Sequence, residues 1–352
     1  MDAINSGVDV EGDVQKSVGV MLEHIGFTFL FGFTALLMVH VQAHAVQYRI
    51  SYAVPIFIVL LAMLYSVAHE WVRMVRGKCP KCTPSIFSAF LAVTVGSLLT
   101  VFIANRVGLG VVVASSLVGF GAALLFPKWA AAAFCGSFVG MLSPESFPTL
   151  PQLLLATFAA AALFWAGAPV FVGFGGKLGT TAFFGCVVAA WFTNAPLLEA
   201  PLPSRQIALL ILFVAALSSA GAYVLSVRCK LGPVMGSALV GLFAGLVFPW
   251  LPVWMNGPLL AVVAFCASFA GMANTERMPT ESHALLAGLI AGGVFVFASP
   301  SLGGAGGKLG TIAFASTLAA KPVGDLLFLL ARPHIKIARA FATAFLGNGV
   351  RD

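Results

Sequence analysis

The stretch GFGGKLGTTAF (residues 173–183) returns as GAGGKLGTIAF (residues 304–314), with nine of eleven positions identical. A second pair, FCGSFVGM (134–141) and FCASFAGM (265–272), matches at six of eight positions, and the members of both pairs are 131 residues apart. A bias toward Ala and Gly alone would not repeat Lys, Cys and Met in register. The chain therefore contains an internal duplication, and the repeated unit decides the fold.

The composition predicts a membrane protein. Of the 352 residues, 60% are hydrophobic and 9% are charged, whereas soluble domains carry about 25% charged residues. The apolar runs are continuous rather than alternating, which favours membrane-spanning helices over a β-barrel. We therefore predict an all-α polytopic membrane protein. The net charge of +7 suits cytoplasmic loops and does not indicate nucleic acid.

Twelve apolar segments are candidates for membrane crossing. They lie at about 18–43, 51–72, 85–104, 108–127, 129–143, 151–168, 174–195, 204–226, 231–250, 255–274, 281–299 and 306–321. The segment 129–143 is the weakest, because it has the length of a re-entrant or half helix. The basic loop from Arg73 to Lys81 predicts a cytoplasmic position for that loop. With twelve crossings, both termini are then cytoplasmic, in a plasma membrane or the inner membrane of a bacterium.

The duplication divides the chain into four parts. Residues 1–84 form a polar tail and a helical hairpin, 85–197 the first repeat, 198–321 the second repeat, and 322–352 a basic amphipathic segment. Each repeat holds five predicted segments, and an odd number of crossings forces the two copies into opposite orientations. We therefore expect inverted repeats, as in many transporters. If the FCxSFxGM segments are re-entrant, each copy has four crossings and the copies are parallel.

The repeated GGKLGT motifs combine groups that suit a small anion or another polar solute. A lysine at the centre of the hydrocarbon costs about 2.5–3.5 kcal/mol on insertion scales, and the two glycines before it weaken a helix. We expect a break and then a new helix, whose first N–H groups attract negative charge. The candidate binding residues are Gly175, Gly176, Lys177, Gly179 and Thr180 with Gly306, Gly307, Lys308, Gly310 and Thr311.

A purely structural role is the alternative for both repeated motifs. Each lysine would then reach from a helix end to the membrane surface, and the glycines would allow close helix packing. The phenylalanines of FCxSFxGM could narrow a passage, although core packing is the commoner use of such a pattern. The pore-lining candidates are Ser137, Phe138, Ser268 and Phe269.

Acidic side chains are absent from the interior of the predicted spans of both repeats. They lie in the tail, in loops or at segment ends, and only Glu23 of the hairpin falls inside an apolar stretch. Ion-coupled carriers commonly hold buried carboxylates, so this pattern favours a channel or uniporter over a coupled transporter. Sodium bound by carbonyl and hydroxyl oxygens keeps an ion-coupled secondary transporter as an alternative.

The hairpin suggests a second class, a membrane redox or metal-binding subunit. Its histidines are residue types that bind haem or a metal, although their spacing specifies no site. Cys79 and Cys82 form one CxxC in the cytoplasmic loop, which fits half of a zinc site or a redox pair. A structural zinc site needs four ligands, and no set in the chain completes it. We therefore expect no cofactor, with zinc or haem as the alternatives.

Together these patterns predict a channel or uniporter-like carrier rather than an enzyme, since no cluster resembles a hydrolytic or transferase site. The expected partners are the lipid bilayer and a small solute, with an anion favoured. Nucleic acid is not an expected partner, and a homo-oligomer is left open.

The fragment GGKLGTT (175–181) resembles a short motif of fluoride channels. Those channels are much shorter single units, so we carry over no residue role from them.

Overall fold

The described part of the chain is built from helices. The computed structural model describes residues 10–77 and 85–346, and no strand occurs among them. The hairpin helices are α1 (Val10–Tyr48) and α2 (Ile50–Val75). The first repeat contains α3 (Ile86–Val101), η1 (Phe102–Val107), α4 (Val111–Leu125), α5 (Ala130–Val139), α6 (Leu150–Ala166) and α7 (Lys177–Thr193). The second contains α8 (Arg205–Tyr223), η2 (Val224–Arg228), α9 (Pro233–Val247), η3 (Phe248–Trp250), η4 (Val253–Met255), α10 (Gly257–Ala270), α11 (Glu281–Ala298) and α12 (Lys308–Leu346).

The predicted all-α fold is confirmed, and each of the twelve predicted segments overlaps one of the helices α1–α12. Within the described residues, seven helices are long and apolar enough to cross a membrane, and five more apolar helices have 10–17 residues. The shortest of these, α5, has 10 residues and is therefore about 15 Å long. The hydrocarbon core is about 30 Å thick, so α5 alone covers about half of it.

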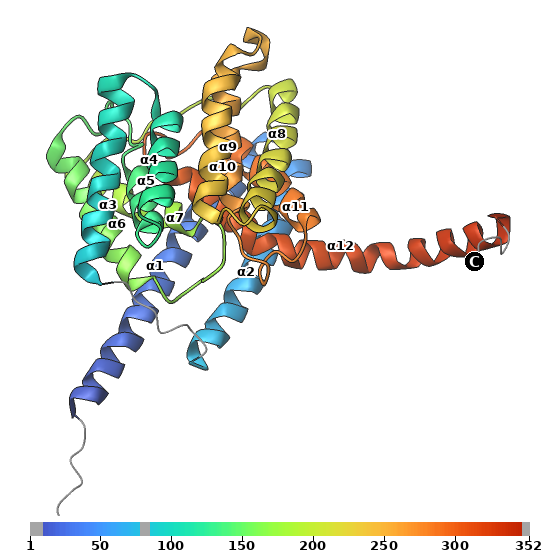
Figure 1. Ribbon diagram of the computed structural model, residues 1–352. Coiled ribbons are helices and arrows are strands. Elements are labelled where there is room, and N and C mark those ends of the chain that lie inside the picture. Colours follow the sequence, from blue (N-terminus) through green and yellow to red (C-terminus); the bar gives the residue numbers. More distant parts are fainter. Residues whose placement is uncertain (1–9, 78–84, 347–352) are drawn as a thin grey trace, which may run out of the picture.

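The two repeats have the same order of elements, apart from η3 and η4, which occur in the second repeat between α9 and α10. Each begins with a long helix that ends in a π-helical turn, η1 after α3 and η2 after α8. Gly110 and Gly232, with φ of 75° and 84°, then precede α4 and α9. In Figure 1 the first repeat (cyan to green) lies beside the second (yellow to orange). The hairpin (blue) contacts both repeats, because α1 packs on α6, α7, α11 and α12.

The connections between helices lie at two ends of the bundle. We call the first of these ends the Glu70 end. Glu70 lies near the end of α2, and Arg277 of the loop after α10 donates two hydrogen bonds of 2.5 and 2.8 Å to its carboxylate. The same guanidinium donates to the carbonyl of Val172, in the loop before α7, at 3.1 Å. The end of α2, the loop before α7 and the loop after α10 therefore lie together.

We call the second group of connections the Ser301 end. His44, near the turn between α1 and α2, shares a hydrogen bond of 2.6 Å with the Ser301 hydroxyl in the loop before α12. The N–H of Ser143, in the loop after α5, donates to the carbonyl of Gly304 in that same loop at 2.9 Å. Most of the length of α2 separates this end from Glu70, so the two groups lie at opposite ends of the bundle.

The last helix continues beyond the second repeat. α12 runs from Lys308 to Leu346 without interruption, so the predicted amphipathic segment 322–352 begins inside this helix. Figure 1 shows the C-terminal part of α12 extending away from the bundle.

Candidate functional site: two lysine-lined cavities

Each GGKLGT motif forms a tight turn that starts a helix. Gly176 and Gly307 have φ of 80° and 84°, a left-handed conformation that glycine adopts at no steric cost. They are the N-cap residues of α7 and α12, which begin at Lys177 and Lys308. The break and new helix expected from the sequence are therefore present in both copies, and each lysine lies in the first turn of a helix.

Helices α7 and α12 cross where two repeated glycines meet. A Cβ added to Gly179 would lie 2.4 Å from the Cα of Gly310, and a Cβ added to Gly310 would lie 2.4 Å from the Cα of Gly179. Neither position has room for a side chain unless the helices move apart. Close packing is thus a physical reason for glycine at both positions.

The order of contacts gives the direction of this crossing. The N-cap of α7, Gly176, lies against Phe314, which is beyond the crossing point on α12. The N-cap of α12, Gly307, lies against Phe183, which is beyond the crossing point on α7. The helices therefore pass one another in opposite directions, and the lysines that follow the two N-caps lie on opposite sides of the crossing.

Lys177 lines a cavity of about 340 Å³, which we call the Lys177 cavity. Its wall is formed by the turn before α7, the start of α9 and Met272 at the end of the second FCxSFxGM motif. The ammonium group of Lys177 donates to the carbonyls of Ala168 at 3.1 Å and Val170 at 2.5 Å. Because the turn before α7 belongs to the Glu70 end, this cavity lies toward that end.

Lys308 lines a second cavity of about 530 Å³, the Lys308 cavity. Its wall is formed by the turn before α12, the segment 200–204, Val111 at the start of α4, and Met141 at the end of the first FCxSFxGM motif. The ammonium group of Lys308 donates to the carbonyl of Ser301. Each cavity thus combines the lysine turn of one repeat with the methionine and a helix start of the other.

The other polar residues of FCxSFxGM make matched hydrogen bonds in the two repeats. The motif cysteine donates to the leucine carbonyl of GGKLG at 3.4 Å in the first repeat and 3.1 Å in the second. The motif serine bonds a serine of the preceding helix at 2.8 Å in both. The pairs are Cys135–Leu178, Cys266–Leu309, Ser137–Ser115 and Ser268–Ser237. These bonds tie α5 to α4 and α7, and α10 to α9 and α12.

The phenylalanines of FCxSFxGM form a four-ring cluster between α5 and α10. The ring centroids are 4.4 Å apart for Phe134–Phe138, 4.6 Å for Phe138–Phe269 and 4.5 Å for Phe265–Phe269. All four side chains are buried. The predicted pore-lining residues Ser137, Phe138, Ser268 and Phe269 lie in this packed region and line neither of the two cavities.

The structure divides the ten predicted binding residues into two groups. Six line the cavities, and these are Gly175, Gly176, Lys177, Gly306, Gly307 and Lys308. The other four, Gly179, Thr180, Gly310 and Thr311, lie at the helix crossing and are buried. Thr181, which the sequence did not single out, lines the Lys177 cavity instead of Thr180.

A buried ion pair is the main polar feature that sequence reasoning missed. Only 8% of the Glu70 side chain and 12% of the Arg277 side chain are exposed, and the guanidinium lies 4.2 Å from the centroid of the Phe174 ring. Glu70 was expected at the end of a segment, whereas it lies inside α2. Its presence in the apolar run 51–72 was the one available signal, since a carboxylate there needs a partner.

The hairpin does not assemble a metal site in the part of the chain that is described. No group of three or more His, Cys, Asp or Glu residues could hold a metal ion there. His24 packs edge-on against Trp71, with ring centroids 5.5 Å apart, and His44 bonds Ser301. Cys79 and Cys82 lie outside the described residues.

No known protein family, curated protein or solved structure matches this chain, so the resemblance to fluoride channels carries no argument. The seven long apolar helices among its described residues make it a multi-pass helical membrane protein. Its candidate functional site is the pair of cavities, each with a repeated lysine and each built from both repeats.

Proposed function

We propose that the protein transports a small anion across the membrane, as a channel or uniporter-like carrier and not as an enzyme. The observation that carries the proposal is the pair of lysine-lined cavities at opposite ends of the bundle. Each cavity presents a lysine together with the first turn of a helix, where unpaired N–H groups and the helix dipole favour negative charge. A single site of this kind could be structural, but a pair suits the two ends of one path.

The charge of both cavities supports an anion. Lys177 donates hydrogen bonds to the carbonyl oxygens of Ala168 and Val170, and Lys308 donates one to the carbonyl oxygen of Ser301. These acceptors are neutral, and no carboxylate lies among the described lining residues of either cavity. An ionisable side chain inside the membrane marks a substrate or ion path by default. An entering anion would compete with the carbonyls for the ammonium group.

We further propose that the two repeats are inverted. Corresponding loops support this, because the loop after α5 lies at the Ser301 end and its counterpart after α10 lies at the Glu70 end. Likewise the turn before α7 lies at the Glu70 end and its counterpart before α12 at the Ser301 end. Opposite placement is expected for repeats related by a two-fold axis in the membrane plane, whereas parallel copies would place matching loops at one end.

The path is closed between the cavities in this conformation. The glycine crossing of α7 and α12 and the four-ring cluster of α5 and α10 are tightly packed. An anion would pass only if these contacts shift, which favours a gated channel or a carrier over a permanently open pore. Helices α5 and α10 meet at aromatic side chains rather than at backbone. We therefore propose that rotation of these phenylalanine rings opens the path.

Ion coupling is the closest alternative, and the carboxylates argue against it. Glu70 is the buried acidic residue of the described chain, and Arg277 occupies both of its oxygens. A carboxylate held in this way is not free to bind and release a proton or sodium ion during transport. We therefore propose uniport without a cofactor, in a membrane with both termini on the cytoplasmic side.

Flux through liposomes tests the proposal. Purified protein would be reconstituted, and the flux of halides, nitrate, formate and phosphate compared with that of alkali cations and neutral solutes. We expect flux of at least one small anion. Lys177→Met and Lys308→Met should each lower this flux at least about tenfold, which corresponds to about 1.4 kcal/mol. Lys128→Met is the matched control, because Lys128 is exposed and lines neither cavity.

The outcomes separate the functional and structural interpretations of the lysines. Anion flux that survives both cavity substitutions, with the same unfolding temperature as the control, would show that the lysines only hold their turns. Absence of flux for every solute would overturn transport itself. In that case a stoichiometric metal or a bound chromophore in the purified protein would support the redox or metal-binding alternative.

A further inference from the structure

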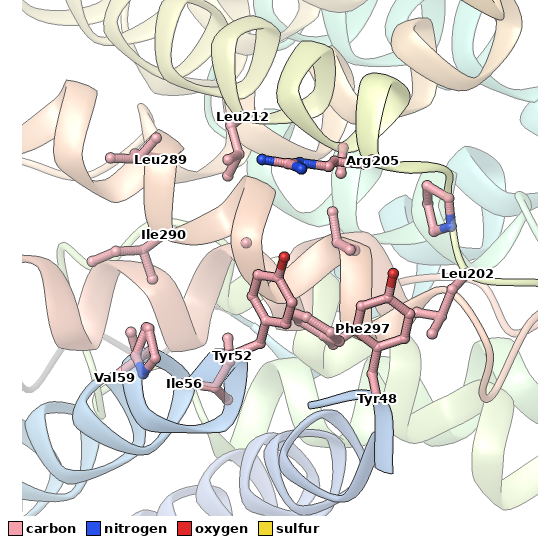
Figure 2. A pocket seen from close by; sticks show the side chains of 15 residues that line it. Tyr48, Tyr52, Ile56, Val59, Leu202, Arg205, Leu212, Leu289, Ile290 and Phe297 are labelled. Carbon is pink, nitrogen blue, oxygen red and sulfur yellow. The ribbon is translucent and has the colours of Figure 1, made fainter. Parts of the chain in front are cut away.

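A third cavity lies apart from the two lysines, between α2, α8 and α11. It is lined by fifteen residues and has a volume of about 340 Å³, which is within the range of sites that bind small ligands. Figure 2 shows Tyr48, Tyr52 and Arg205 around one end of this groove and aliphatic side chains along the rest. The groove therefore has one polar end and one apolar end.

The polar end carries an unbalanced positive charge. Arg205 is the first residue of α8 and is exposed, and within the described chain it makes no hydrogen bond or ion pair. It is the one charged residue among those that line the groove. The hydroxyl groups of Tyr48 and Tyr52 point toward the side on which Arg205 lies (Figure 2). These groups can together bind a phosphate.

The apolar part of the groove runs toward the middle of the membrane. Val59 follows Tyr52 by seven residues on α2, and Leu212 follows Arg205 by seven residues on α8. Leu289 precedes Phe297 by eight residues on α11. At 1.5 Å per residue, the three helices extend the groove about 10–12 Å from its polar end. An occupant needs a charged head and an extended apolar chain.

We propose that this groove binds one anionic glycerophospholipid. Its phosphate lies against Arg205 and the two tyrosine hydroxyls, and one acyl chain occupies the apolar part between α2, α8 and α11. Tyrosine is enriched at the level of the lipid headgroups, and arginine binds phosphate through paired, charge-assisted hydrogen bonds. The lipid would hold the hairpin helix α2 against α8 and α11 of the second repeat.

Native mass spectrometry of the full chain tests this site. The protein would be titrated with phosphatidylglycerol and with phosphatidylcholine of the same acyl chains. We expect one tightly retained phosphatidylglycerol. Arg205→Gln should weaken its binding at least about tenfold, the effect of losing a charged hydrogen bond, and reduce the preference for phosphatidylglycerol over the zwitterionic phosphatidylcholine. Arg106→Gln is the control, because Arg106 is also an exposed arginine at a helix end and does not line the groove.

A second variant tests the apolar part of the groove without removing charge. Gly293 lines the groove, and a Cβ there would meet only the Cδ2 atom of Leu212, at 4.0 Å. Gly293→Leu should therefore fill the groove and abolish lipid retention. Gly221→Leu in α8 is its control, because a Cβ at Gly221 would meet nothing within 4 Å.

Three outcomes would overturn the lipid site. One is equal retention of the two lipids by the wild type, and another is unchanged phosphatidylglycerol binding in Gly293→Leu at an unchanged unfolding temperature. The third is a dimer that Gly293→Leu dissociates while lipid binding stays the same, because a second copy would then occupy the groove. Glycerophosphoglycerol, which lacks acyl chains, should not displace the lipid if the apolar groove contributes to binding.

Discussion

At the scale of single residues, glycine and lysine have separate tasks in the repeated motif. Gly179 and Gly310 bring the backbones of α7 and α12 into contact, so they determine how closely the helices cross. The lysines two positions earlier point back to carbonyls of the turns before their helices. The crossing therefore sets the distance between the repeats, and the turns hold the charges at the cavities.

The glycine crossing gives a prediction for stability. Gly179→Ala should lower the free energy of unfolding by about 1–3 kcal/mol, the usual cost of overpacking, because its Cβ would overlap the backbone of α12. Gly310→Ala should have a similar effect, since the contact is reciprocal. Thermal unfolding in detergent would measure both changes.

The matched control for this pair is Gly121→Ala in α4. A Cβ at Gly121 would meet nothing within 4 Å, and alanine is the better helix former, so stability should stay the same or rise slightly. If Gly179→Ala were as stable as this control, α7 and α12 would be able to separate at little cost.

The sequence predicted the two turns but not all of their contacts. The glycines before each lysine and the cost of a charge in hydrocarbon were enough to place the helix starts within about three residues. They could not show that Thr180 would be buried at the crossing while Thr181 faces the cavity. That choice depends on the direction in which α7 passes α12, and no local pattern encodes that direction.

At the scale of helices, the buried pair of Glu70 and Arg277 joins α2 to the loop after α10. A second pair, Arg228 with Glu281, also has a contact of 2.5 Å, but 59% and 39% of its side chains are exposed. Arg277 makes two hydrogen bonds to Glu70 and is largely buried, whereas Arg228 bonds Glu281 through Nε alone and is exposed. Loss of the carboxylate should therefore cost more stability in the buried pair than in the exposed pair.

Glu70→Gln should destabilise the protein by about 3–5 kcal/mol, because it leaves the charge of Arg277 buried without a carboxylate. Glu281→Gln, the control, should have a much smaller effect, since water can solvate Arg228. Denaturant unfolding of the purified variants would measure both. Replacing Glu70 and Arg277 together with Met should recover part of the loss, and no recovery would mean that the pair has a role besides charge balance.

Helices were more predictable than the contacts between them. Continuous hydropathy located all twelve, and the weakness of the segment 129–143 indicated the short helix α5. Hydropathy could not pair Glu70 with Arg277, because these residues are 207 positions apart and each belongs to a different apolar environment. Nor could it indicate the groove between α2, α8 and α11, which depends on how the hairpin packs on the second repeat.

At the scale of the whole molecule, the proposed inversion predicts the side from which each cavity is reached. Val172 lines the Lys177 cavity and Ser204 lines the Lys308 cavity, and both are exposed. Val172→Cys and Ser204→Cys should react with a membrane-impermeant thiol reagent from opposite sides of the membrane. Labelling of intact cells and of inverted vesicles would measure this.

The labelling needs a background without other accessible thiols. Cys229 is exposed and would be replaced with Ser together with Cys79 and Cys82, while the buried Cys135, Cys186 and Cys266 can stay. Reaction of both engineered cysteines from one side would refute the inverted arrangement. The parallel arrangement, with four crossings in each repeat, would then be the correct one.

Because each cavity draws its lysine from one repeat and its methionine from the other, neither repeat could enclose a cavity alone. A protein made of one repeat would have to pair with a second copy of itself, and its two cavities would be identical by symmetry. Gene fusion removes that constraint, and the halves of this chain have already diverged. Phe174 and Thr181 line one cavity where Ala305 and Ile312 line the other, so natural selection can adjust entry and exit separately.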